Sequence, residues 1–252
     1  STPKPSSAAS DVYKRQSTYS TTAMYDHVEV VRGPTGLMTG MGDPSGTINF
    51  VRKQPTDAAQ FIATARAGSW NNFSGEFDAS GPLNDSGSVR GRFVTSQQSR
   101  DYFTDGYSSR KQLYYGVVDI DITANTTLTL GGHSNREDNP GSEWMGVPTA
   151  PDGSPLDIRR SRRFSPSWSY WDKSEYSLFA ELKHTFDNGW IARAAARGVN
   201  GKSSLDGAYF VSGDYDAQGG IVYDVMGGRY DYDKKQRLSL IHISEPTRLG
   251  MI

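Results

Sequence analysis

Apolar and polar residues alternate with a period of two along most of the chain between Phe61 and Asp233. This period is typical of a β-strand with one apolar face and one polar face. The pattern recurs eight times and predicts strands around these segments: 61–67, 73–80, 89–93, 118–122, 127–130, 176–183, 190–197 and 221–233. The polar faces carry charged residues, among them Arg90, Arg92, Asp119, Asp121, Arg193 and Arg197. The sequence therefore predicts an all-β chain.

The connections between these strands alternate in length. Apart from a short link at 68–72, tight turns and long loops follow one another. The tight turns are 81–88, 123–126 and 187–189, and the long loops are 99–111, 134–174 and 200–220. In an antiparallel meander this order collects the tight turns at one end of the sheet. Bacterial outer-membrane barrels have this layout, and their interiors accept charged residues. We therefore predict antiparallel transmembrane β-barrel strands.

Composition narrows the classes of function. The chain of 252 residues has a formal net charge of −1, which argues against a general nucleic-acid binder. It contains no cysteine, which excludes a disulfide scaffold and a thiolate metal site. The four histidines lie in separate predicted elements, and neither G-x-S-x-G nor H-E-x-x-H occurs. We therefore expect no enzyme activity and no nucleic-acid partner.

A glycine-rich segment from Met24 to Pro55 precedes the predicted strands. The sequence predicts a strand at 28–31, then five glycines, then a second strand at 47–51. A dinucleotide-binding turn would need a helix after the glycines, because the helix N-terminus holds the pyrophosphate. Here Pro44 lies in the turn and a strand follows, so this interpretation fails.

The segment VEVVRGPTGLMTGMGDPSGTINFVRKQP closely resembles the C-terminal part of the plug domain of TonB-dependent ferric-siderophore receptors. FDASGPLN and WSYWDKSEYSLFAELKHTFDNGW resemble the early barrel of the same family. The resemblance implies part of a plug at 17–58 and the N-terminal barrel strands at 59–236, out of about 22 strands in a complete barrel. The ends, 1–16 and 237–252, contain DVYKRQ and LSLIHISEPTR, which resemble translated adapter sequence. We expect non-native tails there and a fragment between them.

The resemblance also implies a function without an active site. A receptor of this family in the Gram-negative outer membrane would bind a ferric siderophore and import it when the TonB complex rearranges the plug. Its partners would be the siderophore complex, TonB and outer-membrane lipid, and no resident cofactor is expected. The family pattern assigns ion pairs between plug and barrel to Arg32, with Glu29 beside it.

The loop 134–174 offers candidate ligand contacts near an outer mouth. Aromatic faces and guanidinium groups suit aromatic or anionic iron chelates. The candidates are Trp144, Met145, Arg159, Arg160 and Tyr170. Two other roles stay open for such residues: aromatic side chains near a strand form the interfacial girdle, and arginines pair with lipid phosphates.

Two other folds also fit the alternation. One is a complete eight-stranded outer-membrane barrel, acting as an adhesin or a pore. The other is a soluble β-sandwich that binds carbohydrate. A closed eight-stranded barrel requires the first strand to pair with the last, whereas the receptor fragment requires an open edge at the last strand.

Overall fold

The computed structural model describes residues 21–32, 46–144 and 146–245, and all its regular elements are strands. β1 (Tyr25–Arg32) and β2 (Gly46–Arg52) form an antiparallel pair. Eight further strands form a second sheet: β3 (Gln60–Gly68), β4 (Asn72–Pro82), β5 (Val89–Asp101), β6 (Ser108–Thr123), β7 (Thr126–Asp138), β8 (Tyr170–Thr185), β9 (Ile191–Tyr215) and β10 (Ile221–Ser244). Both strands predicted in the glycine-rich segment and all eight predicted later are present.

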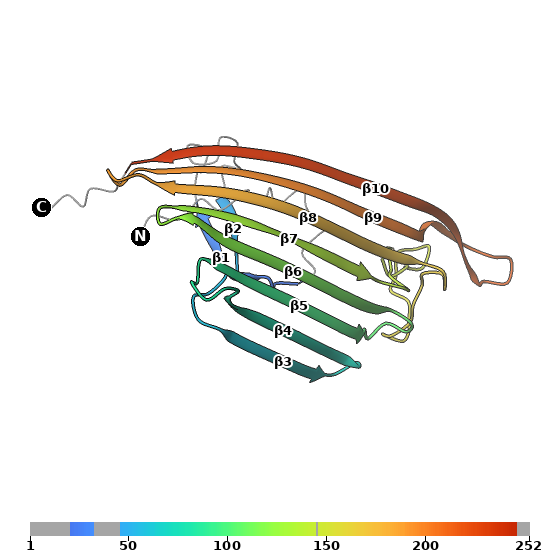
Figure 1. The fold of residues 1–252 in the computed structure, drawn as a ribbon. Helices are drawn as coiled ribbons and strands as arrows, with labels where there is room; N and C mark the ends of the chain where they lie inside the picture. The colour runs from blue at the N-terminus through green and yellow to red at the C-terminus, as the bar shows by residue number, and fades with distance from the viewer. Residues whose placement is uncertain (1–20, 33–45, 145, 246–252) are drawn as a thin grey trace, which may run out of the picture.

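The eight-stranded sheet is an open antiparallel meander. Each strand pairs with its sequence neighbours in the order β3 to β10, and β3 and β10 are the two edges (Figure 1). β3 therefore does not close onto β10, which contradicts the self-contained eight-stranded barrel and agrees with the open edge expected for the receptor fragment. Among the described residues, no helix has the length and apolar character of a membrane span.

The two faces of the eight-stranded sheet differ in polarity. The face that contacts β1 and β2 is called the inner face here, and the opposite face is the outer face. The charged side chains predicted for a wet interior lie on the inner face, where they find partners on neighbouring strands. Arg90 pairs with Asp121 (2.7 Å), Arg193 pairs with Glu181 (2.9 Å), and Asp119 accepts a hydrogen bond from Thr129 (2.6 Å). The outer face exposes Phe73, Phe77, Phe93, Ile122, Leu130, Leu178 and Leu182. This is the arrangement of a lipid-facing sheet with a polar lining.

The β1–β2 sheet packs on the inner face, behind the larger sheet in the view of Figure 1. Met24 and Ala23, just before β1, are buried together with four residues of β5 and β6. Those four are Val94, Leu113, Tyr115 and Val117. The main buried cluster thus lies between the two sheets, so burial of apolar surface joins them.

The connections separate as predicted, with three differences in length. The predicted loop 134–174 shrinks to 139–169. The turns after β4, β6 and β8 gather at one end, called the turn end, and the connections after β3, β5, β7 and β9 lie at the other, the loop end. The predicted loop 99–111 shrinks to 102–107. The predicted loop 200–220 is wrong, because β9 continues through it and leaves only 216–220 as a turn. β9 and β10 pair with each other over this length and form a hairpin that projects beyond β8.

β10 is also longer than predicted at its other end. The sequence predicted a last strand ending near Asp233 and a tail from residue 237, but β10 continues to Ser244. Its final residues pair with the start of β9, from Leu238 opposite Arg197 to Ser244 opposite Ile191. The physical reason is the free edge of β9 there, since an unpaired strand edge presents backbone donors and acceptors to any adjacent extended segment.

Candidate functional site

A cluster of charged side chains joins the β1–β2 sheet to the inner face. The Nζ of Lys53, one residue after β2, lies 2.8 Å from a carboxylate oxygen of Asp78 on β4. Arg92 on β5 donates two hydrogen bonds to the same carboxylate, at 2.8 and 2.7 Å. A carboxylate oxygen of Glu76, also on β4, lies 3.5 Å from the same Nζ of Lys53. The Asp78 side chain is only 4% exposed, so two cations hold one buried carboxylate.

The local sequence explains this geometry. Asp78 and Glu76 fall on the polar face of β4, and antiparallel pairing with β5 brings Arg92 beside them. Lys53 approaches from the opposite side because its backbone N–H donates to the Met24 carbonyl at 3.0 Å, which holds the end of β2 close to the start of β1. Charge-assisted hydrogen bonds of this kind are short and strong. The cluster can therefore hold the small sheet in place and release it when the ion pairs separate.

Neutral contacts extend the interface around the cluster. The buried Tyr115 hydroxyl donates a hydrogen bond to the Lys53 carbonyl at 2.8 Å. The guanidinium of Arg52 lies over the Phe179 ring, 4.5 Å from its centroid. Farther along, Thr56 donates two hydrogen bonds to Ser80 Oγ on β4, at 2.9 and 2.8 Å. The chain from Arg52 to Thr56 is thus fixed at several points.

We expect Tyr115→Phe to loosen this segment, because it leaves the Lys53 carbonyl without its buried donor. The cost of such a loss is about 1–3 kcal/mol. In the complete receptor, hydrogen exchange of the amides around Lys53 should then accelerate at least about fivefold. The control is Tyr114→Phe, which removes a hydroxyl from the adjacent residue on the outer face. Equal exchange in the two variants would contradict a role for the Tyr115 hydrogen bond.

Glu29 lies in β1, where its described partners are in the small sheet. Asn49 donates to it at 2.8 Å and His27 lies 3.2 Å away, and these hydrogen bonds lower the pKa of Glu29. The hydrogen bonds of His27 to Asp26 and then to Glu29 raise the pKa of the imidazole. These groups form a local polar network on β1 and β2, in which Glu29 and Asn49 are half-buried.

Arg32 and Met145 are two predicted site residues whose side chains lie outside the described residues. Arg32 is the last residue of β1 and pairs through its backbone with Gly46. The ion pairs predicted between Arg32 and the larger sheet stay a prediction, as does a ligand contact at Met145.

Trp144 lines a pocket at the loop end of the sheet. Its ring packs edge-to-face against Tyr209 on β9 and Tyr230 on β10, with centroids 5.4 and 4.9 Å away. The pocket has a volume of about 710 Å³ and lies between the loop after β7 and the projecting hairpin. Its lining includes four aromatic residues: Trp144, Tyr209, Phe210 and Tyr223. The hairpin residues were missed in the sequence because 200–220 was interpreted as a loop.

The other predicted ligand residues lie outside this pocket. Arg159 forms an ion pair with Asp105, and Arg160 lies 5.7 Å from the centroid of the Phe103 ring. Both contacts connect the loop after β7 to the connection after β5. Tyr170 begins β8, with its hydroxyl 3.5 Å from Ser204 on β9. The structure thus separates Trp144 from three residues that were grouped with it.

Sequence reasoning missed Lys53 and Asp78, which form the buried ion pair of this interface. Lys53 belongs to the motif that carried the resemblance, and Asp78 lies within FDASGPLN, so both segments had been recognised. The available signal was the acidic pair Glu76 and Asp78 on the polar face of a strand in a predicted wet interior. Within the described ranges, no group of three or more His, Asp or Glu side chains could hold a metal ion.

Comparisons with known proteins give consistent matches. No family model matches the chain. The chain is 40% identical over 215 residues to the ferric-pyoverdine receptor of Pseudomonas sp. strain M114, covering 84% of this chain and 26% of that protein. It is 36% identical over 245 residues to the ferripyoverdine receptor of Pseudomonas aeruginosa, covering 96% of this chain and 30% of that protein.

A solved structure of a ferripyoverdine receptor matches the fold of this chain. The outer-membrane ferripyoverdine receptor of Pseudomonas aeruginosa, bound to ferripyoverdine, superimposes with a TM-score of 0.83 at 33% identity. The match covers 91% of this chain and 30% of the solved chain. The present chain therefore spans less than a third of the length of these relatives.

Proposed function

Because the chain belongs to the TonB-dependent siderophore receptors of the Gram-negative outer membrane, we propose that the complete protein binds a ferric siderophore and imports it. In this proposal, β1 and β2 are part of the plug and β3 to β10 are barrel strands. The fold is the all-β one expected from the alternation, and the comparisons favour neither a soluble sandwich nor a small pore.

The observation that carries this proposal is the buried charge cluster between the two sheets. A plug that only filled the barrel would be held well enough by apolar contacts. Breaking a buried ion pair by removing one partner costs about 3–5 kcal/mol, whereas separating both charges into water restores their hydration. Lys53 and Asp78 are thus suited to a contact that is stable at rest and opens when force hydrates it. The TonB complex is the proposed source of that force.

The proposed substrate class is a ferric chelate of the pyoverdine type. Relatives at 36% and 40% identity are named for such chelates, and the pocket beside Trp144 offers aromatic faces at the loop end. The pocket volume of about 710 Å³ fits part of a large chelate rather than all of it. Other loops and the remaining plug would complete the site. Outer-membrane lipid is the further proposed partner, facing the apolar outer surface.

The test uses cells that lack other siderophore receptors and express the complete protein. We expect uptake of radiolabelled iron as ferric pyoverdine, and we expect uptake to stop when TonB is absent. The absence of uptake with every ferric pyoverdine tested, at normal receptor levels in the outer membrane, would contradict the proposed substrate class.

A single substitution tests the pocket at the loop end. Trp144→Ala should weaken binding of the ferric chelate about tenfold, because buried aromatic anchors carry a large share of binding energy. The measurement is equilibrium binding to the purified receptor. Trp168→Ala is the matched control, since it removes the same side chain from the same loop outside the pocket lining. Similar affinities for the two variants would show that the pocket is not used.

A further inference from the structure

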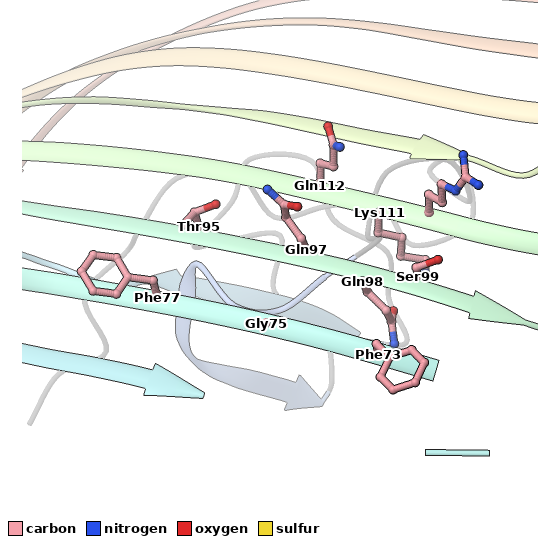
Figure 2. Close-up of a pocket in the computed structure, with 10 residues that line it drawn as sticks. Phe73, Gly75, Phe77, Thr95, Gln97, Gln98, Ser99, Lys111 and Gln112 are labelled. Carbon is pink, nitrogen blue, oxygen red and sulfur yellow. The ribbon is translucent and has the colours of Figure 1, made fainter. Parts of the chain in front are cut away.

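A second cavity lies on the outer face, near the loop end of β4, β5 and β6. Figure 2 shows it in front of these strands, with the small sheet behind them. Phe73 and Phe77 stand on the same side of β4, two positions before and after Gly75, and they are 59% and 41% exposed. Because Gly75 has no side chain, a gap of about 510 Å³ opens between the rings and the neighbouring strands.

Polar residues line the opposite side of this cavity. Across the sheet, Gly75 is opposite Gln97 on β5, which is opposite Gln112 on β6. Ser99 and Thr95 flank Gln97 on the same face of β5. Arg110 lies beside Ser99 on β6 and is exposed. On the outer face the cavity therefore joins two aromatic rings, two side-chain amides, two hydroxyls and a guanidinium, and Gln98 and Lys111, at the alternate positions of β5 and β6, complete its lining.

These polar residues belong to a belt on an otherwise apolar surface. From β5 to β7 the belt includes two arginines and two aspartates, Asp101, Arg110, Arg136 and Asp138, and Arg136 pairs with Asp138 at 2.9 Å. The next row toward the turn end begins with Phe93, and from there the outer face of β5 to β8 is apolar as far as Leu182. A border of this kind marks the level where lipid headgroups meet acyl chains. The long loops place it in the outer leaflet.

We propose that this cavity binds a phosphorylated, acylated sugar lipid of the outer leaflet. The guanidinium of Arg110 suits a phosphate, which accepts its planar array of N–H donors. The amides and hydroxyls suit sugar hydroxyls and amide-linked acyl groups. The two rings offer walls for an acyl chain that continues along the apolar surface toward the turn end. This surface faces away from the plug and is separate from the siderophore path.

The geometry of two glycines provides a clean test. A side chain at Gly75 would meet nothing within 4 Å, so Gly75→Leu fills the gap without displacing the strand. Gly116 lies on the same face of β6, opposite Phe93, and a side chain there also meets nothing within 4 Å. It is outside the cavity lining, so Gly116→Leu is a matched control.

The experiment titrates the complete receptor in mild detergent with diphosphorylated lipid A and measures bound lipid by native mass spectrometry. We expect Gly75→Leu to weaken binding at least about tenfold, and Gly116→Leu to leave it unchanged. The Arg110→Gln receptor should bind diphosphorylated lipid A about tenfold more weakly than the wild type does. The same variant should bind dephosphorylated lipid A as tightly as the wild type does. Heat-modifiable migration on gels verifies that each barrel is folded.

Three results would overturn the proposal. One is wild-type affinity of the Gly75→Leu receptor for lipid A. Another is equal loss in the Gly75→Leu and Gly116→Leu receptors, which would indicate a general change of the lipid-facing surface. The third is equal affinity of the wild type for phosphatidylglycerol, which has a phosphate and acyl chains without the sugar. If Gly75→Leu failed to fold, the Arg110→Gln titration would decide alone.

Discussion

Replacing Asp78 with asparagine in the complete receptor is expected to free the β1–β2 sheet from the barrel. The substitution keeps the size of the side chain but removes the one buried carboxylate that faces both Lys53 and Arg92. Two cations, 17% and 11% exposed, would then lie near each other without their shared counter-charge. Leaving buried charge uncompensated costs about 3–5 kcal/mol. This is a large share of the free energy that holds any small sheet against a neighbour.

The measurement is hydrogen exchange of the amides in β2 and the segment after it. A loss of this size should accelerate their exchange roughly a hundredfold or more, while amides of the barrel strands remain protected. A second readout is permeability, because a loosened plug opens the barrel. Cells with the Asp78→Asn receptor should become sensitive to large antibiotics that the outer membrane normally excludes.

The matched control is Asp57→Asn, four residues after Lys53. Asp57 also forms an ion pair with the inner face, 3.5 Å from Arg90, but its side chain is 96% exposed. Exposed ion pairs contribute about 0–1 kcal/mol, so this variant should behave almost as the wild type. If both variants changed exchange equally, burial would not be what makes the cluster strong. If neither changed it, the apolar contacts alone would hold the plug.

The alternation in the sequence was sufficient to predict the barrel strands because their two faces meet different solvents. Where lipid lies on one side and water on the other, apolar and polar residues must alternate, as in Phe73 to Ser80 on β4. The order of turns then followed, because consecutive turns in a meander lie at opposite ends. Even the charged residues of the inner face, such as Arg92, were assigned correctly by their position in the alternation.

The projecting part of the β9–β10 hairpin could not be predicted in the same way. Beyond Asp206, opposite the first residue of β8, β9 has no strand on that side and continues to Tyr215. A hairpin that packs against a loop and not against lipid needs no regular apolar alternation, and its glycines imitate a loop. Its only firm local signal is the turn at 216–220, where Asp216 accepts hydrogen bonds from the backbone of Gln218 and Gly220.

The charge cluster exposes a different limit. The polar face of β4 predicted that Asp78 points inward, but one of its two partners, Lys53, follows β2 of the separate small sheet. Which cation reaches Asp78 depends on how the small sheet docks, and no spacing in the sequence encodes that. The family resemblance directed attention to Arg32, whereas the described ion pairs between the end of β2 and β4 are made by Lys53. The docking of Lys53 is therefore a tertiary feature, and the ion pairs of Arg32 stay a prediction.

The second large effect is expected at Gly141, where two outer connections meet. Its backbone φ is 73°, a region that favours glycine, and its N–H donates to the Ser169 carbonyl at 2.7 Å. An added Cβ would lie 2.1 Å from the carbonyl oxygen of Gly106 in the connection after β5. The same carbonyl accepts a hydrogen bond from Arg163 at 3.2 Å. An alanine therefore cannot fit unless the two connections move apart.

Gly141→Ala should open the loop after β7 to protease. Arg159, Arg160, Arg162 and Arg163 lie in this loop, so trypsin cleavage there reports its opening directly. We expect cleavage of the folded receptor to accelerate at least about tenfold, because the strained backbone costs roughly 1–2 kcal/mol and the steric clash adds to it. Binding of the ferric chelate should weaken as well, since Trp144 follows Gly141 by three residues and its position depends on this contact.

Gly153→Ala separates the clash from the backbone strain. Gly153 lies in the same loop with a φ of 82°, but a side chain there meets nothing within 4 Å. It should therefore incur the conformational cost of roughly 1–2 kcal/mol without moving the connection after β5, and cleavage should accelerate clearly less than in Gly141→Ala, which carries the steric clash as well. Equal cleavage of the two variants would show that backbone conformation alone sets the stability of the loop. Faster cleavage of Gly141→Ala alone, together with weaker chelate binding, would establish that the two outer connections hold the binding pocket in place through this single close approach.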